Sequence, residues 1–160
     1  MNNNLKPGSL LFRSKGIVEH VGVYLGGDRV IHSSPETGVK VVLIKEFCKG
    51  KAIKVQNVED LDVETLSARI ETIFAGSTEY CLTSRNCQHI ANYLIHGTPV
   101  SPQLRWALLG GVLGSLFATY RGSNSMLYLA GGALLGCLVY SGSLKYDLLL
   151  NENEIGSAIL

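Results

Sequence analysis

Residues 20–32 read HVGVYLGGDRVIH, with a histidine at each end and the turn-forming triplet Gly26-Gly27-Asp28 between two runs of β-branched and aromatic residues. This pattern predicts two strands joined as a hairpin. Because side chains alternate between the faces of a strand, the turn decides whether the two histidines meet. A two-residue loop sets His20 against Ser33 and leaves His32 on the other face. A site that uses both histidines therefore requires an odd-length turn or a bulge.

The hairpin belongs to a β-rich N-terminal region punctuated by Gly and Pro. Its expected strands are Ser9–Arg13, Val18–Leu25, Arg29–His32, Val39–Ile44 and Ala52–Val55. Two amphipathic helices follow. Asp62 caps the first, which extends to Ala75, and Asn86 caps the second, which ends before Gly97. The expected fold class is therefore α+β, with an antiparallel sheet packed on two helices.

Cys87 lies in the first turn of the second expected helix, directly after its cap Asn86. The free N–H groups and the positive dipole end of a helix start stabilise a thiolate. The same N–H groups, notably that of Cys87 itself, are candidates to hold the oxyanion that forms when a thiolate adds to a carbonyl, and Asn86 is a secondary candidate. The alternative is that Cys87 is a small buried hydrophobe, the usual role of a free cysteine.

A cysteine nucleophile needs a base and a group that orients the base. His20 is the candidate base. His32 is the candidate third member, because a neutral imidazole accepts the N–H of another histidine. On the same face of the hairpin, Gly22 would leave space for a substrate, and Tyr24 is a secondary hydroxyl donor, with a packed strand tyrosine as the alternative. His89 points away from the cysteine and is expected to be structural.

Composition limits the other classes of function. The 160 residues carry a formal net charge of +1 without basic blocks, so neither a nucleic-acid groove nor a polybasic membrane patch is indicated. The 4 cysteines show no metal-type spacing and are expected to be thiols in a reducing compartment. Residues 1–6 lack the features of a secretory signal, so the catalytic part is expected to face the cytosol.

The hydrophobic residues concentrate after Gln103. Trp106–Tyr120 and Met126–Tyr140 are uncharged apolar stretches, each shorter than the roughly 20 residues of a standard membrane span. They predict a tight membrane hairpin, or one span with an interfacial segment. The alternative is a pair of buried helices in a soluble oligomer.

Small-xxx-small glycine pairs in both stretches would allow close helix approach. The pairs are Gly110 with Gly114 and Gly132 with Gly136. Residues 98–103 contain two prolines and are expected to be a linker. The expected organisation is a catalytic domain at residues 6–103, a hydrophobic membrane-associated segment at 104–143 and a polar/apolar tail at 144–160.

Four motifs occur in order within residues 6–104, and they are Pro7-Gly8-Ser9-Leu10, His20 with Tyr24, Val30-Ile31-His32 and Thr83-Ser84-Arg85-Asn86-Cys87-Gln88-His89. With the apolar C-terminal region, they resemble the lecithin:retinol acyltransferase family and its small phospholipase/acyltransferase relatives. The resemblance implies a circularly permuted papain-like fold, in which the histidine strands precede the cysteine helix. It also implies Cys87 as nucleophile, His20 as base and His32 as third member, with no metal or organic cofactor.

The function expected from this resemblance is that of a lipid acyltransferase or phospholipase A that forms a thioester on Cys87. A phospholipid would donate the acyl group, and water, an amine or a hydroxyl would accept it. Membrane attachment, with the catalytic domain facing the cytosol, would keep the nucleophile beside its insoluble substrate. Two alternatives remain open. One is a papain-like cysteine peptidase or amidase, and the other is a non-catalytic protein that keeps the histidine and Asn-Cys motifs for interaction at membranes.

Overall fold

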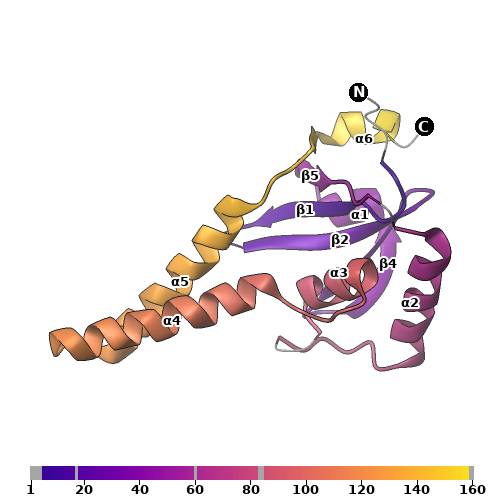
Figure 1. The fold of residues 1–160 in the computed structure, drawn as a ribbon. Coiled ribbons are helices and arrows are strands. Elements are labelled where there is room, and N and C mark those ends of the chain that lie inside the picture. The colour runs from indigo at the N-terminus through magenta and orange to yellow at the C-terminus, as the bar shows by residue number, and fades with distance from the viewer. Residues whose placement is uncertain (1–4, 17, 60, 83–84, 159–160) are drawn as a thin grey trace. The chain divides into compact units, whose positions relative to one another are not determined.

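The computed structural model describes residues 5–16, 18–59, 61–82 and 85–158. They form two compact units. The first unit contains the chain up to residue 100, apart from residues 16–18, together with residues 145–160, and the second contains residues 16–18 and 101–144. Figure 1 shows the helices and strands of both units and labels most of them. Thr83 and Ser84 of the fourth predicted motif lie outside the described residues.

The first unit is built on a sheet of 6 strands in the order β4-β3-β2-β1-β5-β6. The strands are β1 (Leu10–Lys15), β2 (Val18–Gly26), β3 (Arg29–Ser34), β4 (Gly38–Leu43), β5 (Ile53–Gln56) and β6 (Leu148–Leu150). The first five coincide with the predicted strands, except that their ends differ by up to two residues. The paired strands run antiparallel, so the α+β class with an antiparallel sheet is confirmed.

A bulge in the β2–β3 hairpin sets the register of the two histidines. The paired residues are Gly22 with His32, Val23 with Ile31, Tyr24 with Val30 and Gly26 with Arg29. Leu25 of β2 therefore has no counterpart in β3. The loop itself consists of Gly27 and Asp28, both with positive φ, as a tight hairpin turn requires. His20 and His32 consequently lie diagonally on one face, which confirms the prediction in its bulge form.

One face of the sheet is covered by two short helices, α1 (Ile44–Cys48) and α6 (Glu152–Ala158). Their buried residues join a core made of Leu5, Leu11, Tyr24, Val30, Val42, Ile44, Phe47, Cys48, Ile53, Val55, Leu150, Ile155 and Ala158. The backbone N–H of Leu5 donates to the carbonyl oxygen of Ala158 at 3.0 Å and joins α6 to the N-terminal segment. The sequence predicts neither helix, because 5 and 7 residues are too few to display a helical period.

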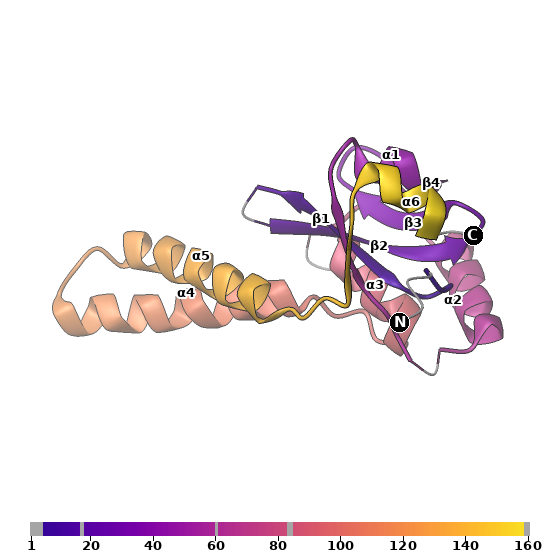
Figure 2. The same cartoon turned by 90° about the horizontal axis from the view of Figure 1, so that it is seen from above.

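The opposite face is covered by the two predicted helices, α2 (Val63–Ala75) and α3 (Cys87–His96). Figure 2 shows the sheet between this pair and α1 with α6. Asp62 caps α2 by accepting a backbone N–H of its first turn at 3.0 Å. Gly97 ends α3 with a φ of 72°, a conformation that glycine adopts without strain. Nη1 of Arg69 in α2 donates to the carbonyl oxygens of Leu94 and Ile95, both at 2.8 Å, and ties α2 to this end of α3.

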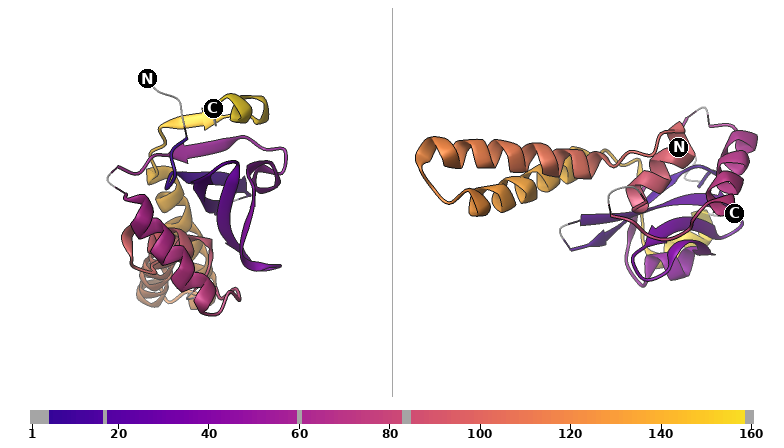
Figure 3. Two further views of the ribbon diagram at one scale, coloured as in Figure 1. Left: turned by 90° about the vertical axis from the view of Figure 1, so that its right-hand side faces the viewer. Right: turned by 90° about the horizontal axis from the view of Figure 1, so that it is seen from below.

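The second unit is an antiparallel pair of long helices, α4 (Pro102–Arg121) and α5 (Ser125–Ser143), which lie side by side in Figures 1 and 3. The predicted linker is shorter than expected, because Ser101 caps α4 and Pro102 occupies its first turn, where a missing N–H is harmless. Each helix extends beyond the apolar stretch predicted for it. Twenty residues of α-helix span about 30 Å, which matches the hydrocarbon core of a bilayer.

Glycines bring α4 and α5 into backbone contact, as the small-xxx-small pattern predicts. Gly110 and Gly132 face each other, and a Cβ on either would collide with the carbonyl oxygen of the other. A Cβ on Gly114 would collide with the carbonyl oxygen of Tyr128, and one on Gly136 with a backbone carbonyl of α4. Residues with a side chain at these positions would hold the helices farther apart.

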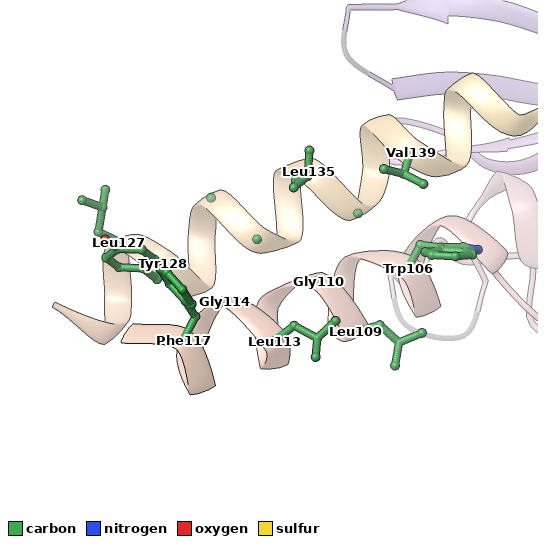
Figure 4. Close-up of a pocket in the computed structure, with 13 residues that line it drawn as sticks. Trp106, Leu109, Gly110, Leu113, Gly114, Phe117, Leu127, Tyr128, Leu135 and Val139 are labelled. Atoms are coloured by element: carbon green, nitrogen blue, oxygen red, sulfur yellow. The ribbon is translucent and has the colours of Figure 1, made fainter. Parts of the chain in front are cut away.

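The surface of this hairpin is apolar. A groove of about 590 Å³ follows the contact between the helices, and its lining carries no charged side chain. Figure 4 shows Trp106, Phe117, Leu127, Leu135 and Val139 along it. Within the described part of the chain, α5 is the one helix long and apolar enough to cross a membrane. Its most apolar segment has a mean hydropathy of 1.4, and 6% of the residues in that segment are buried.

After α5 the chain returns to the first unit. The sequence predicts a tail at residues 144–160, but this region contains β6 and α6. β6 extends the sheet beyond β5, with Leu150 opposite Ile53, and Figure 3 shows α6 following it. A strand of 3 residues gives too little pattern to be predicted. The helical hairpin is therefore an insertion between α3 and β6, and both of its ends connect to the first unit.

Candidate active site

The two predicted histidines meet on adjacent strands. Nε2 of His20 in β2 lies 3.0 Å from Nδ1 of His32 in β3, and the rings meet edge to face with centroids 5.0 Å apart. Both side chains are buried, with 6% and 9% of their surface exposed. The bulge at Leu25 makes this contact possible, because it places both residues on the same face.

Both imidazoles of this pair are neutral at physiological pH. The pKa of His20 is lowered to about 3, mainly by burial and then, in decreasing order, by the neighbouring His32, Arg13, Lys15 and Lys49. Burial likewise lowers the pKa of His32 to about 4, with Lys40 as the next cause. In a neutral pair one ring donates and the other accepts. When His20 donates from Nε2, its Nδ1 carries the lone pair and can act as a base.

Cys87 is the first residue of α3, as predicted. The side-chain oxygen of Asn86 caps the helix by accepting the N–H of His89 at 3.0 Å, and its amide nitrogen donates to the carbonyl oxygen of Leu82 at 2.9 Å. Both ends of the Asn86 amide therefore bond the backbone of its own segment. This arrangement fixes the first turn of α3, where Cys87 stands.

The Cys87 sulfur lies against β2 beside His20. Burial raises the pKa of the Cys87 thiol, while hydrogen bonds from the backbone N–H groups of Val21, Gln88 and Cys87 itself lower it. The helix start acts in the direction predicted from the sequence, but burial outweighs it and the pKa is raised overall. Among the described residues, Cys87 has no hydrogen bond to either imidazole. The structure thus joins the two histidines directly and brings Cys87 to the peptide that follows His20.

Two other residues of this strand have structural roles that differ from the prediction. Tyr24 is packed in the core with 2% of its surface exposed, and its hydroxyl oxygen accepts the backbone N–H of Asp28 at the turn. The alternative of a packed strand tyrosine therefore describes it. Gly22 does not leave space for a substrate, because a Cβ there would lie 2.6 Å from Cγ1 of Val30 and 2.8 Å from Cε2 of Phe47.

Comparison with protein families bears directly on this arrangement. The family described as lecithin retinol acyltransferase matches residues 3–100, a span that holds His20, His32 and Cys87. The chain belongs to the lecithin retinol acyltransferase family. The resemblance of the sequence motifs to this family is thereby confirmed.

Individual members of the family match this chain at similar levels of identity. Lecithin retinol acyltransferase of Rattus norvegicus is 28% identical, over 85% of this chain and 80% of that protein. Phospholipase A and acyltransferase 3 of Mus musculus is 29% identical, over 64% of this chain and 78% of that protein. The match to lecithin retinol acyltransferase of Homo sapiens, at 27% identity, covers 52% of this chain and about half, 51%, of that protein.

Two further residues, Phe47 and Arg13, lie next to the histidine pair, and the sequence does not predict their position there. The ring of Phe47 stacks on His20 with centroids 5.5 Å apart and meets His32 edge on at 5.6 Å. Nη1 of Arg13 donates to the carbonyl oxygen of Phe47 at 2.6 Å. Phe47 lies in the short helix α1, which lacks a sequence pattern, so no signal connects it with the histidines.

The described residues contain no group of three His, Cys, Asp or Glu side chains that converge as metal ligands would. Glu19, the carboxylate next to His20 in sequence, pairs with Lys54 at 2.7 Å and is thereby occupied. The chemistry available at this site consists of one thiol, two neutral imidazoles and the backbone N–H groups at the start of α3.

Proposed function

We propose that the chain is a lipid acyltransferase or phospholipase A in which Cys87 attacks an acyl ester of a phospholipid. The observation that carries this proposal is the buried, neutral imidazole pair, with His20 Nε2 3.0 Å from His32 Nδ1, together with the Cys87 sulfur, which accepts the backbone N–H of Val21, the residue after His20. The relatives named as acyltransferases and phospholipases support a lipid substrate.

In the first half-reaction, the enzyme becomes acylated. His20 accepts the thiol proton of Cys87 at Nδ1 while its Nε2–H stays on His32, and the sulfur bonds to the ester carbonyl carbon. Backbone N–H groups of Cys87 and Gln88 hold the oxyanion. The carbon–oxygen bond of the ester then breaks, and the His20 imidazolium returns the proton to the departing lysophospholipid oxygen.

In the second half-reaction, an acceptor removes the acyl group. Water, an alcohol or an amine gives a proton to Nδ1 of His20 and attacks the thioester carbonyl, and the Cys87 thiolate leaves and regains a proton. Water as acceptor gives a free fatty acid, and an alcohol or amine gives a new ester or amide. Neither half-reaction requires a metal or an organic cofactor.

The free enzyme rests as a thiol and a neutral imidazole. Burial raises the pKa of Cys87 and lowers that of His20, so an ion pair is disfavoured before the substrate binds. The sulfur is held by the N–H of Val21 and must leave it to approach His20. Catalytic hydrogen bonds commonly tighten only in the substrate complex. Proton transfer therefore accompanies attack.

We also propose the circularly permuted papain-like fold for the first unit. Two features support it. The histidine strands β2 and β3 precede the cysteine helix α3 in the chain. The nucleophile stands at the start of that helix, which packs on an antiparallel sheet.

In this proposal the α4–α5 hairpin attaches the enzyme to a membrane. Because β5 and β6 pair directly and flank the hairpin in the chain, both of its ends leave one folded unit and lie on the same side of the bilayer. The number of crossings is therefore even. Because α5 is apolar enough to cross by itself and an even number requires a second crossing, we infer that α4, which packs on α5 through the glycine contacts, crosses with it. The catalytic unit would then lie in the cytosol and the loop at residues 122–124 on the opposite side.

The function is tested with detergent-solubilised enzyme and phosphatidylcholine that carries labelled acyl chains. We expect the wild type to release labelled fatty acid and to hold a covalent label that hydroxylamine removes. Cys87→Ala should do neither. Cys81→Ala is the matched control, because Cys81 is another partly exposed cysteine of the same segment that forms no disulfide, and it should retain both.

Circular dichroism establishes that each variant is folded. A folded wild type that shows neither a covalent label nor lipid turnover would refute the lipid function. Cleavage of peptide or amide substrates in place of lipid would favour the papain-like peptidase. Labelling of Cys81 instead of Cys87 would refute the assignment of the nucleophile.

A further inference from the structure

Phe47 is in contact with both members of the histidine pair. Its ring lies nearly parallel to that of His20, with an interplanar angle of 26° and centroids 5.5 Å apart. It meets His32 at 67° and 5.6 Å. With 2% of its surface exposed, Phe47 covers the pair from the side of α1. One rigid ring thus restricts the rotation of two imidazoles.

Arg13 holds Phe47 in place from the neighbouring strand β1. Its Nη1 donates to the carbonyl oxygen of Phe47 at 2.6 Å, and its guanidinium carbon lies 5.5 Å from the centre of the Phe47 ring. Arg13 is itself 8% exposed. Arginine is rarely buried unless its guanidinium is paired or hydrogen-bonded, because desolvation of that charge is costly.

The charged groups around the pair are mostly cations. A polar cavity of about 360 Å³ borders His32 and Arg13, and the charged residues in its lining are Arg13, Lys40, Lys49, Glu36 and Glu46. Lys15 of β1 also acts on His20. From α3, the thiol of Cys87 approaches the backbone N–H of Val21, the residue after His20. Protonation of either imidazole is therefore opposed by positive charges on β1, β4 and the end of α1.

We propose that Phe47 and Arg13 are positioning residues that hold the His20–His32 pair in one orientation and one charge state. The Phe47 ring keeps Nε2 of His20 on Nδ1 of His32, which leaves Nδ1 of His20 as the base. Arg13 fixes Phe47 and adds the charge that keeps the pair unprotonated. This role rests on the proposed function of the pair, but the geometry of the cluster is independent of the substrate.

The first test is Phe47→Leu, which keeps apolar volume and removes the ring face. Phe12→Leu is the matched control, because Phe12 is also buried, in strand β1, and packs on Tyr146 instead of the histidines. We expect kcat of Phe47→Leu for phosphatidylcholine to fall about tenfold or more while KM stays nearly unchanged, since misplacement of a catalytic group by about 1 Å has effects of this size or larger. The acidic limb of its pH profile should move to higher pH, because an imidazole that water reaches is protonated more easily.

A second measurement does not depend on activity. Carbon-13 labelled histidine rings are followed by NMR against pH, and the signals are assigned with His20→Gln and His32→Gln. In the wild type and in Phe12→Leu, neither ring of the pair should titrate between about pH 5 and 8, whereas in Phe47→Leu at least one should move toward the ordinary pKa of about 6.5.

Two substitutions of Arg13 separate the effect of its charge from that of its hydrogen-bonding geometry. Arg13→Gln should raise the pH at which the pair titrates, and Arg13→Lys should restore much of the wild-type titration because it keeps the charge. If Phe47→Leu and Arg13→Gln titrate like Phe12→Leu and keep its pH profile, the positioning role is wrong. A wild type without lipid turnover refutes the proposed function, yet the NMR titration still decides the positioning role.

Discussion

Gly22 lies directly opposite His32 in the β2–β3 ladder, and the space above its Cα is filled by Val30 and Phe47. We predict that Gly22→Ala lowers the free energy of unfolding by about 1–3 kcal/mol, because the new methyl group overpacks the site. Turnover should fall as well, because Phe47 must move away from the imidazoles. Chemical denaturation and lipid turnover measure the two effects.

The control for this substitution is Gly76→Ala. A Cβ at Gly76 meets its nearest atoms at 3.6 Å, an ordinary contact, and its φ of −93° suits alanine. Unchanged stability and turnover of Gly22→Ala would contradict the packing described around the histidine pair.

Stability should depend on pH through the same pair. The pKa values of His20 and His32, about 3 and about 4 in the folded protein, lie below the ordinary value of 6.5, so the unfolded chain binds more protons at mildly acidic pH. Stability is therefore greatest above the unfolded pKa and falls as the pH drops from 6.5 toward the folded values.

Urea denaturation between pH 7 and pH 5 measures this slope. We expect His32→Gln to reduce it, because the substitution removes one of the two buried imidazoles. Equal slopes for the wild type and His32→Gln would show that the pair is already protonated or exposed in the folded protein.

The glycine contacts of the hairpin predict a steric effect. Gly132→Leu should separate α4 and α5, because a Cβ at Gly132 collides with the backbone of Gly110. Gly131→Leu is the matched control, since a Cβ there meets nothing within 4 Å. Distances between spin labels on the two helices, in lipid vesicles, should increase only in the first variant. An increase in both would mean that helix stability, not close approach, is affected.

Chain topology predicts which side of a membrane the hairpin loop reaches. In sealed microsomes with the cytosolic face outward, Ser123→Cys should react with a membrane-impermeant maleimide only after detergent is added. Lys45→Cys, in the exposed part of α1, should react without detergent. Labelling of Ser123→Cys without detergent would mean that the hairpin enters the membrane and returns without crossing it.

The sequence was sufficient to predict a structural feature where a single side chain determines the local backbone conformation. Asn86 caps α3 through its own side-chain oxygen, so the position of Cys87 at the helix start is predictable. Gly97 ends that helix for an equally local reason. The contact between His20 and His32 could be predicted only on the condition that the hairpin has an odd-length turn or a bulge. The choice between a longer loop and a bulge at Leu25 depends on the packing of the whole sheet.

Features that depend on tertiary contacts were missed. Phe47 lies in a helix of 5 residues, and only the folded sheet brings it to the histidines. The pKa of Cys87 was expected to fall at the helix start, yet it rises because burial, which the sequence does not specify, exceeds the effect of the N–H groups. The run Leu148–Leu150 carries no sign that it will pair with β5.

The pairing of Ile53 with Leu150 closes a chain loop that includes α2, α3 and the entire hairpin. Contacts between residues so distant in sequence form slowly, because the loop must lose its conformational freedom first. An antiparallel helix pair brings the ends of its own segment together and thereby shortens the effective loop. If a bilayer stabilises that pair, it also accelerates completion of the sheet, so the membrane would govern the folding rate of this protein as well as the access to lipid proposed for it.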